Sequence, residues 1–399
     1  MPKAEFELAP VDEFDFRLFI KALGKGEKGA RTLTFAESSL LIQGFAKGKV
    51  TQAQMASAMM LMRVRGETAA EVAGVVSGLK HTIDARWQAI QVDVDWPVYA
   101  GKREQLPWLL LVAKVLATKG LRVMLHGDSL ALPHRRHVES CIEALNIASA
   151  KTVMEAEQAL QANGIVYVHA GVLAPVLDDC RLLHQELGLR SLIQTASRCM
   201  NPANAVLSLR SYFHPGLDDL HQSIAEMLFA EGDYQQGTIA IFKGLQGETE
   251  VNPRVTTDVR FIKKSSGSKL QFSACALPTV LEGFSGAKVG QSELAAQSLA
   301  HLWHTILPFE SSILADEMTD SMIDQALSSV EATLCLVLCL QQVSSSKPLD
   351  VKENLLLAQQ CWSERLSFTA PNRIERVNRL LKHSPDDASF DAKDRVCAV

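Results

Sequence analysis

The sequence has no long apolar run, no closely spaced cysteine pair and no excess of positive charge. Without an uninterrupted apolar stretch of about 18 residues, no membrane-spanning helix is predicted. The acidic start, MPKAEFELAPVDEFDF, lacks the apolar core of a signal peptide. The 8 cysteines are scattered without a Cys-x-x-Cys motif, which is typical of reduced thiols in a cytoplasmic protein.

Charge and aromatic content limit the kinds of partner. A net charge of −5 excludes a uniformly basic nucleic-acid binder but leaves room for a local basic groove. Aromatic residues make up 6% of the chain, so a stacking platform for single-stranded nucleic acid is not indicated. The chain does contain 47% hydrophobic residues over 399 positions, enough to build a large core in one or two domains.

The first part of the chain has strong helix-start signals. Thr34 with Glu37, and Thr68 with Glu71, have the spacing of capping boxes, and Thr51 fits a further N-cap. Together they predict four short helices before the first strand, which would form a small helical domain over residues 1–88. Helices from residues 172–200 are expected to join it.

Beyond residue 88, strands alternate with helices, which predicts a mostly parallel α/β domain over residues 89–370. Residues 371–399 are polar and charged and are expected to form a loosely held tail. Within the α/β domain, a helix is expected over Arg136–Asn146, and the clearest expected strands are Ile90–Val94, Leu121–Leu125, Ile165–Ala170 and Thr238–Phe242.

The stretch Gln91–Asp128 has the order strand, loop, helix, strand. In such a unit the strands run parallel, and ligands bind at the edge where they end. An anion there would meet the cations Lys102 and Arg103 beside Gly101, together with the amino end of a helix opened by Pro107. The arrangement therefore predicts a phosphate site.

Four segments in order resemble the anthranilate phosphoribosyltransferases, which form glycosyltransferase family 3. They are Arg63–Gly74, Val123–Gly127, Glu186–Ser191 and Met200–Ala203. The resemblance implies a small helical domain and a large α/β domain of the phosphoribosyltransferase type, with the active site between them. It also implies homodimers formed through the helical domain, with phosphoribosyl pyrophosphate and magnesium (Mg) as ligands.

Several motifs of the family are altered in this sequence. The glycine-rich diphosphate loop of the enzymes is Val98–Arg103 here and keeps only Gly101, so fewer backbone N–H groups could wrap a diphosphate. The lysine of the Lys-His-Gly-Asn motif is Leu125, its asparagine is Asp128, and an arginine that contacts anthranilate is His184. Transfer chemistry depends on positioned charge, so these changes predict its loss.

The adjacent acidic pair that holds magnesium in the enzymes is replaced by Glu248 and Glu250, separated by one residue. Both are oxygen donors of the kind Mg takes, so they are the candidate metal ligands. No other cofactor is indicated.

A further resemblance is to the YbiB-type branch of the same family. It rests on the loop Tyr99–Arg103, on Gly247 and Glu248 followed by Asn252-Pro253, and on Ser211–Pro215. The resemblance implies a catalytically degenerate dimer that binds DNA or RNA without sequence preference. The alternative is an active phosphoribosyltransferase with an unusual site for phosphoribosyl pyrophosphate and magnesium.

The candidate phosphate-binding residues lie on the loops that end the predicted strands. Bound phosphates would make the affinity depend on salt. For the basic residues, the competing interpretation is solvated surface charge, and for His126 it is a structural hydrogen bond between loops. The candidates are Gly101, Lys102, Arg103, His126, Arg135, Arg136 and Arg198.

Overall fold

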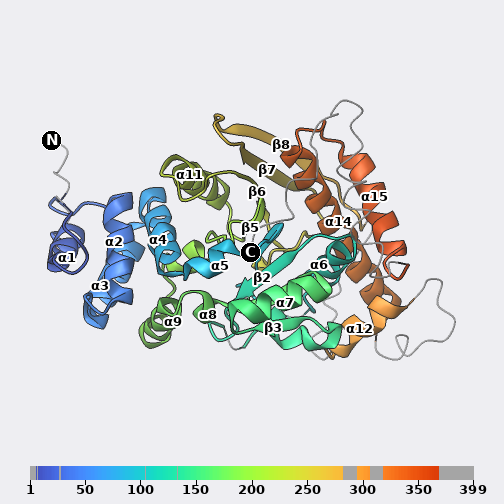
Figure 1. Ribbon diagram of the computed structural model, residues 1–399, viewed down its shortest axis with the longest axis horizontal. Helices are drawn as coiled ribbons and strands as arrows, with labels where there is room; N and C mark the ends of the chain where they lie inside the picture. The colour runs from blue at the N-terminus through green and yellow to red at the C-terminus, as the bar shows by residue number, and fades with distance from the viewer. Residues whose placement is uncertain are drawn as a thin grey trace, which may run out of the picture.

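The computed structural model describes residues 6, 8–26, 28–103, 105–132, 134–281, 294–305 and 318–367. The expected tail, residues 371–399, and Glu104 lie outside these ranges. Helices α1 to α4 form one end of the molecule, and a sheet covered by helices forms the other (Figure 1).

The helical end begins as the capping signals predicted. Thr34, Thr51 and Thr68 each accept a hydrogen bond from the backbone three residues on, and each forms a complete capping box. Helix α9 packs on α2 and α3, and α10 packs on α4. The elements are α1 Arg17–Gly24, α2 Phe35–Ala46, α3 Gln52–Arg65, α4 Ala69–Thr82, α5 Ala85–Ala89, α9 Val176–Leu187 and α10 Ile193–Ser197.

The α/β part is built on one sheet of eight strands in the order β3-β4-β2-β1-β5-β6-β7-β8. All neighbours from β3 to β6 are parallel, and β7 and β8 add an antiparallel edge. The predicted fold class, a helical domain with a mostly parallel α/β domain, is confirmed. The strands are β1 Val94–Pro97, β2 Val123–Gly127, β3 Ala148–Ala150, β4 Ile165–His169, β5 Leu207–Tyr212, β6 Gly237–Lys243, β7 Thr257–Lys264 and β8 Gln271–Leu277.

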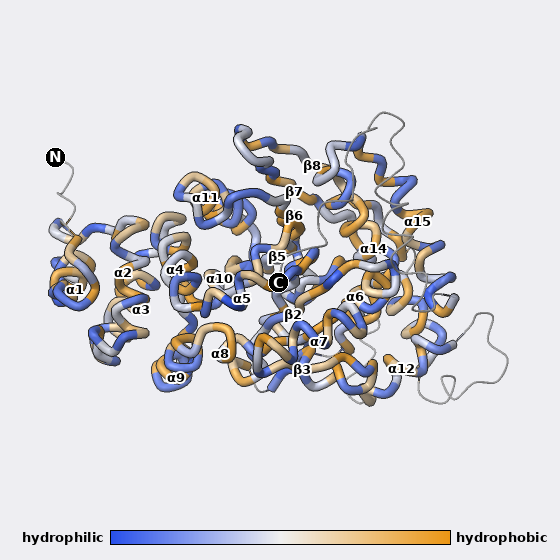
Figure 2. The backbone as a smooth tube through the Cα atoms, viewed as in Figure 1, coloured by the Kyte–Doolittle hydropathy of each residue, from blue (hydrophilic) through white to orange (hydrophobic). Residues whose placement is uncertain are grey.

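Both faces of the sheet are covered. Successive strand residues point to opposite sides, so each strand contributes side chains to two cores. In β2, Val123 and Leu125 join a core with the C-terminal helices, whereas Met124 joins a core shared with the helical end. Figure 2 shows apolar residues along the strands and polar residues on the outer turns of covering helices such as α9. The covering elements also include α6 Leu109–Thr118, α7 Val153–Asn163, α8 Ala170–Leu173, α11 Leu217–Ala230, α12 Gln297–His304, α14 Asp320–Ser344 and α15 Val351–Ser363.

Helix α14 is long and apolar enough to cross a membrane by length and composition alone. Of its most apolar window, 72% is buried inside the protein. It packs on α6, α15 and the strands from β5 to β8 (Figure 1). This is the environment of a core helix.

Three parts of the α/β domain differ from the expectation. Strand β1 is Val94–Pro97, so it shares only Val94 with the strand expected over Ile90–Val94. The α-helix expected over Arg136–Asn146 is replaced by two 3-10 turns, Val138–Cys141 and Glu143–Leu145. Its first residue is instead extended, because Arg136 exchanges backbone hydrogen bonds with Lys102 at 2.8 and 2.9 Å. Strand β5, which lies between β1 and β6, was not among the expected strands.

Candidate anion-binding cleft

The loop that joins β1 to α6 is held by carboxylates from a distant part of the chain. The Gly101 N–H donates to Glu248 Oε2 at 2.7 Å, with Gly101 in the left-handed region at φ 65°. Lys102 Nζ donates to Glu250 Oε1 at 2.8 Å, and neither side chain is exposed. The Leu109 N–H, at the amino end of α6, donates to Glu250 Oε2 at 3.0 Å. The donors expected to bind a phosphate are therefore bound to two carboxylates of the protein itself, Glu248 and Glu250.

The loop after β6 presents these two carboxylates. Thr249, which lies between them, accepts a hydrogen bond from Trp96 Nε1 at 2.9 Å through its carbonyl and donates from Oγ1 to Pro97 O at 2.5 Å. Ser329 of α14 donates a further hydrogen bond to Glu250 Oε1 at 2.8 Å. Strand β1 and helix α14 therefore fix the loop from two sides.

These contacts bear on two sequence expectations. Lys102 is buried and ion-paired, so it does not face a ligand as an accessible cation would. Glu248 and Glu250 already accept from N–H groups and from an ammonium, and a magnesium ion between them would lie against Lys102 Nζ. The residues present therefore do not fit that metal in this arrangement.

His126 lies below the loop in a buried hydrogen-bonded chain. Its Nε2 is 2.9 Å from Asp95 Oδ1, and its Nδ1 is 2.8 Å from the Tyr99 hydroxyl. A ring proton on Nε2 satisfies both bonds, since Nε2 then donates to the carboxylate and Nδ1 accepts from the phenol. Ser208 donates to the other Asp95 oxygen at 2.7 Å. The structure thus gives His126 a structural contact rather than a place on the surface.

Above Tyr99 is a small cleft of about 60 Å³ between the sheet edge and helices α9 and α10. Its charged lining is Arg181, Arg190, Arg198 and Asp128, and the other polar residues that line it are Tyr99, His184, Gln194 and Ser197. A volume of this size holds a few water molecules or a single small anion and is far below that of a typical ligand pocket, about 300 Å³ or more.

Four guanidinium groups influence one another around this cleft. Burial lowers the pKa of Arg135, and the neighbouring Arg103, Arg190 and Arg198 lower it further, while the Glu248 carboxylate raises it. Burial also lowers the pKa of Arg198. Arginine nevertheless stays charged in proteins. The four residues therefore form a concentration of positive charge, and we call Arg103, Arg135, Arg190 and Arg198 the arginine cluster.

The cluster has donors that the protein does not use. The Nε atom of Arg135 is buried without a hydrogen-bond partner, while its Nη1 donates to Ala100 O at 3.1 Å. Arg198 Nη1 donates to Gly247 O at 2.7 Å. Arg103 and Arg190 are exposed, and within the described residues their side chains have no hydrogen bond or ion pair.

The structure divides the predicted residues into two groups. Arg198 lines the cleft, and Arg103 and Arg135 lie close enough to it for their charges to interact with those of Arg190 and Arg198. Arg136 instead donates from Nη1 to Leu294 O. Sequence reasoning missed Arg190, although it lies in the Glu186–Ser191 motif. The signal for it was its place two residues after the helix stop at Gly188.

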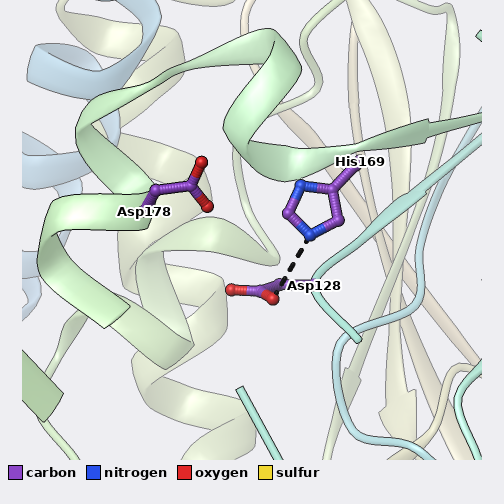
Figure 3. Close-up of side chains that lie close together, drawn as sticks. All are labelled: Asp128, His169 and Asp178. Atoms are coloured by element: carbon purple, nitrogen blue, oxygen red, sulfur yellow. Dashed lines mark ion pairs between the residues drawn. The ribbon is translucent and has the colours of Figure 1, made fainter. Parts of the chain in front are cut away.

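A second charged group, beside the cleft, consists of Asp128, His169 and Asp178. Their ligand-type atoms all lie within 4.8 Å of one another (Figure 3). Arg181 already occupies the group, with Nε 3.1 Å from Asp128 Oδ2 and Nη2 2.8 Å from Asp178 Oδ1. His169 Nε2 is 3.4 Å from Asp128 Oδ1. The carboxylates are therefore neutralised by a guanidinium and an imidazole.

Comparison with known sequences identifies relatives of the chain. Residues 17–82 match the helical bundle domain of the glycosyl transferase family. The uncharacterized protein YbiB of Escherichia coli (strain K12) is 25% identical over 254 residues, which are 63% of this chain and 77% of YbiB. The anthranilate phosphoribosyltransferase of Dictyoglomus thermophilum is 26% identical over 189 residues, which are 47% of this chain and 54% of that enzyme.

Solved structures of the same enzymes share the fold. Anthranilate phosphoribosyltransferase from Thermus thermophilus superposes with a TM-score of 0.60 at 19% identity, covering 90% of this chain and 99% of that one. The enzyme from Saccharomyces cerevisiae in complex with PRPP and Mg gives a TM-score of 0.61 at 13% identity, covering 91% and 98%. The expected resemblance is confirmed.

Removing one member of the buried pair should destabilise the protein strongly. Glu250→Gln leaves the Lys102 ammonium without an anion, so we expect a loss of about 3–5 kcal/mol in the free energy of unfolding, measured by urea denaturation. The double variant Lys102→Met/Glu250→Gln should recover part of that loss, because the unpaired buried charge is gone. Arg63→Met, at an exposed ion pair, is the control and should lose much less. A double variant that loses as much unfolding free energy as Glu250→Gln, or more, would contradict this expectation.

The pH dependence of stability should reveal the His169–Asp128 contact. The ion-pair contact with Asp128, at 3.4 Å, raises the pKa of His169 above 6.5. The stabilisation is therefore complete below pH 6.5 and is lost as the pH rises through the folded-state pKa. The difference in unfolding free energy between the parent protein and His169→Asn should be largest at about pH 6 and shrink towards about pH 9. His304→Asn, at an exposed position, is the control, and a difference that grows with pH would contradict the assignment.

Proposed function

Because this chain is a relative of the anthranilate phosphoribosyltransferases of glycosyltransferase family 3, we propose that it uses their scaffold to bind phosphates of a DNA or RNA backbone. In this proposal it transfers no phosphoribosyl group. The observation that carries the proposal is the internal occupation of the diphosphate position. Glu248 accepts a hydrogen bond from the Gly101 N–H, and Glu250 accepts hydrogen bonds from the Leu109 N–H and the Lys102 ammonium.

A diphosphate would need those same donors. To bind there, it would have to displace two buried carboxylates and leave them without their partners, which costs several kcal/mol for each charge. The groups still available are the exposed guanidinium groups of Arg103 and Arg190, with Arg135 and Arg198 behind them. Side-chain cations of this kind bind single phosphates without fixing a ribose.

The cleft dimensions also favour backbone phosphates. A space of about 60 Å³ does not enclose a nucleoside, so a nucleic acid would lie across the entrance with a phosphate at the arginine cluster. Contacts of this kind read no bases and predict binding without sequence preference. Because the net charge is −5, binding should depend on this local cluster and be sensitive to salt. A homodimer formed through the helical domain, in the cytoplasm, would present two such clusters.

Charge reversal at the cluster tests the proposal. Arg103→Glu/Arg190→Glu should weaken the binding of DNA and RNA duplexes of different sequence to the same degree, measured by fluorescence anisotropy over a range of salt concentrations. The slope of log K against log salt should fall by about 1 for each phosphate that the variant no longer neutralises. A matched control is Lys347→Glu/Lys352→Glu, which reverses two exposed cations just before and on α15, away from the cleft (Figure 1). No binding by the parent protein at low salt, or equal weakening in the control, would sink the proposal.

The second candidate function is an active phosphoribosyltransferase, favoured by the fold shared with an enzyme solved in complex with PRPP and Mg. Calorimetric titration with phosphoribosyl pyrophosphate, with and without magnesium, separates the two. We expect no magnesium-dependent binding, because Glu248 and Glu250 are already paired. Magnesium-dependent heat from the parent protein that disappears in Glu248→Gln would favour the enzyme.

A further inference from the structure

One exposed aromatic ring lies beside the arginine cluster. Strand β5 ends at Tyr212, and the loop that follows, residues 213–216, is exposed at the edge of the sheet where the parallel strands end. Phe213 in this loop is 44% exposed. The other exposed Phe, Tyr or Trp among the described residues is Phe272, at 55%, on the edge strand β8. Single exposed apolar residues are common on protein surfaces, so the surroundings of Phe213 decide whether it has a role.

Phe213 is next to backbone that the cluster holds by hydrogen bonds. A Cβ atom placed on Gly247 would lie 3.4 Å from Phe213 Cβ and 3.6 Å from Ala100 Cβ, so the three residues are neighbours. Arg198 Nη1 donates to Gly247 O at 2.7 Å, and Arg135 Nη1 donates to Ala100 O at 3.1 Å. Two guanidinium groups of the cluster therefore bind the residues that lie beside the exposed ring.

The ring neighbour of Phe213 leaves room for stacking. The ring of His214 is 5.0 Å from that of Phe213, centroid to centroid, and the two planes are at 79°. A nucleic-acid base stacks with its plane parallel to an aromatic ring, whereas this contact is edge to face. His214 can therefore cover no more than one face of the Phe213 ring.

We propose that Phe213 stacks on an unpaired base of a single-stranded nucleic acid while the arginine cluster holds a phosphate of the same strand. The inference rests on the proposed function and specifies the form of nucleic acid that the site prefers. Every base has an aromatic face, so stacking adds affinity without reading sequence. The bases of a duplex are already stacked on one another, so a duplex offers this site its phosphates alone.

A single ring is suited to a single nucleotide. Proteins that bind long single strands stack successive bases on several aromatic side chains. The low aromatic content of this chain argues against such a platform, but one ring next to the phosphate donors does not need it. A base and its phosphate are joined through one sugar, so a stacking ring has to lie close to the guanidinium groups. Phe213 meets this condition, whereas Phe272 is on a strand separated from β5 by β6 and β7.

Abasic strands separate stacking from phosphate contacts. An oligothymidine strand and an abasic strand of the same length carry the same phosphates, and fluorescence anisotropy gives the affinity of the full chain for each. We expect the parent protein to bind oligothymidine about tenfold more tightly than the abasic strand. Phe213→Ala should bring this ratio down to about one, and Phe213→Trp should keep it. The matched control is Phe272→Ala, which removes the other exposed ring and should keep the ratio of the parent protein.

The outcomes distinguish this inference from the proposed function. If the parent protein binds both strands with equal affinity, stacking is overturned and phosphate binding stands. A ratio that survives in Phe213→Ala, or that is lost equally in Phe272→Ala, also overturns the role of Phe213. If the parent protein binds neither strand at low salt, the proposed function fails and this inference fails with it. The comparison of the two strands uses the parent protein alone, so it does not depend on the folding of a variant.

Discussion

The buried ion pair between Lys102 and Glu250 is the contact on which the candidate site depends. Through the same carboxylate, the pair connects the β1–α6 loop, the amino end of α6 and helix α14. None of these groups could be buried alone, because an unpaired charge or N–H group in the interior is costly. The position of each element therefore requires the others.

The ion pair also determines what the site can bind. In a parallel α/β sheet, the loop after a strand and the helix that follows it form a ready anion site. Here Glu248 and Glu250 fill that anion site. The arginine cluster is what remains for an external anion. In the proposed function, this cluster holds a phosphate at the entrance of the cleft.

Local signals made much of the fold predictable, while long-range contacts did not. Thr34, Thr51 and Thr68 act within four residues of the chain, so their capping boxes could be identified from spacing alone. The burial of Lys102 depends on a carboxylate 148 residues away, which no local pattern reveals. The segment after Arg135 has helical periodicity, but its backbone pairing with Lys102 makes it extended at Arg136. Arg190 belongs to the cluster only because α9 and α10 bring it to the sheet edge.

Glu248 and Glu250 can also be regarded as ligands tethered to their own binding site. A tethered group acts at an effective concentration on the order of millimolar or higher, and any free phosphate must compete with it. The stiffness of the connecting segment, residues 244–252, then sets the apparent affinity of the inner position. Substitutions that loosen this segment, including at Thr249, would change that affinity without altering any atom that touches the incoming anion.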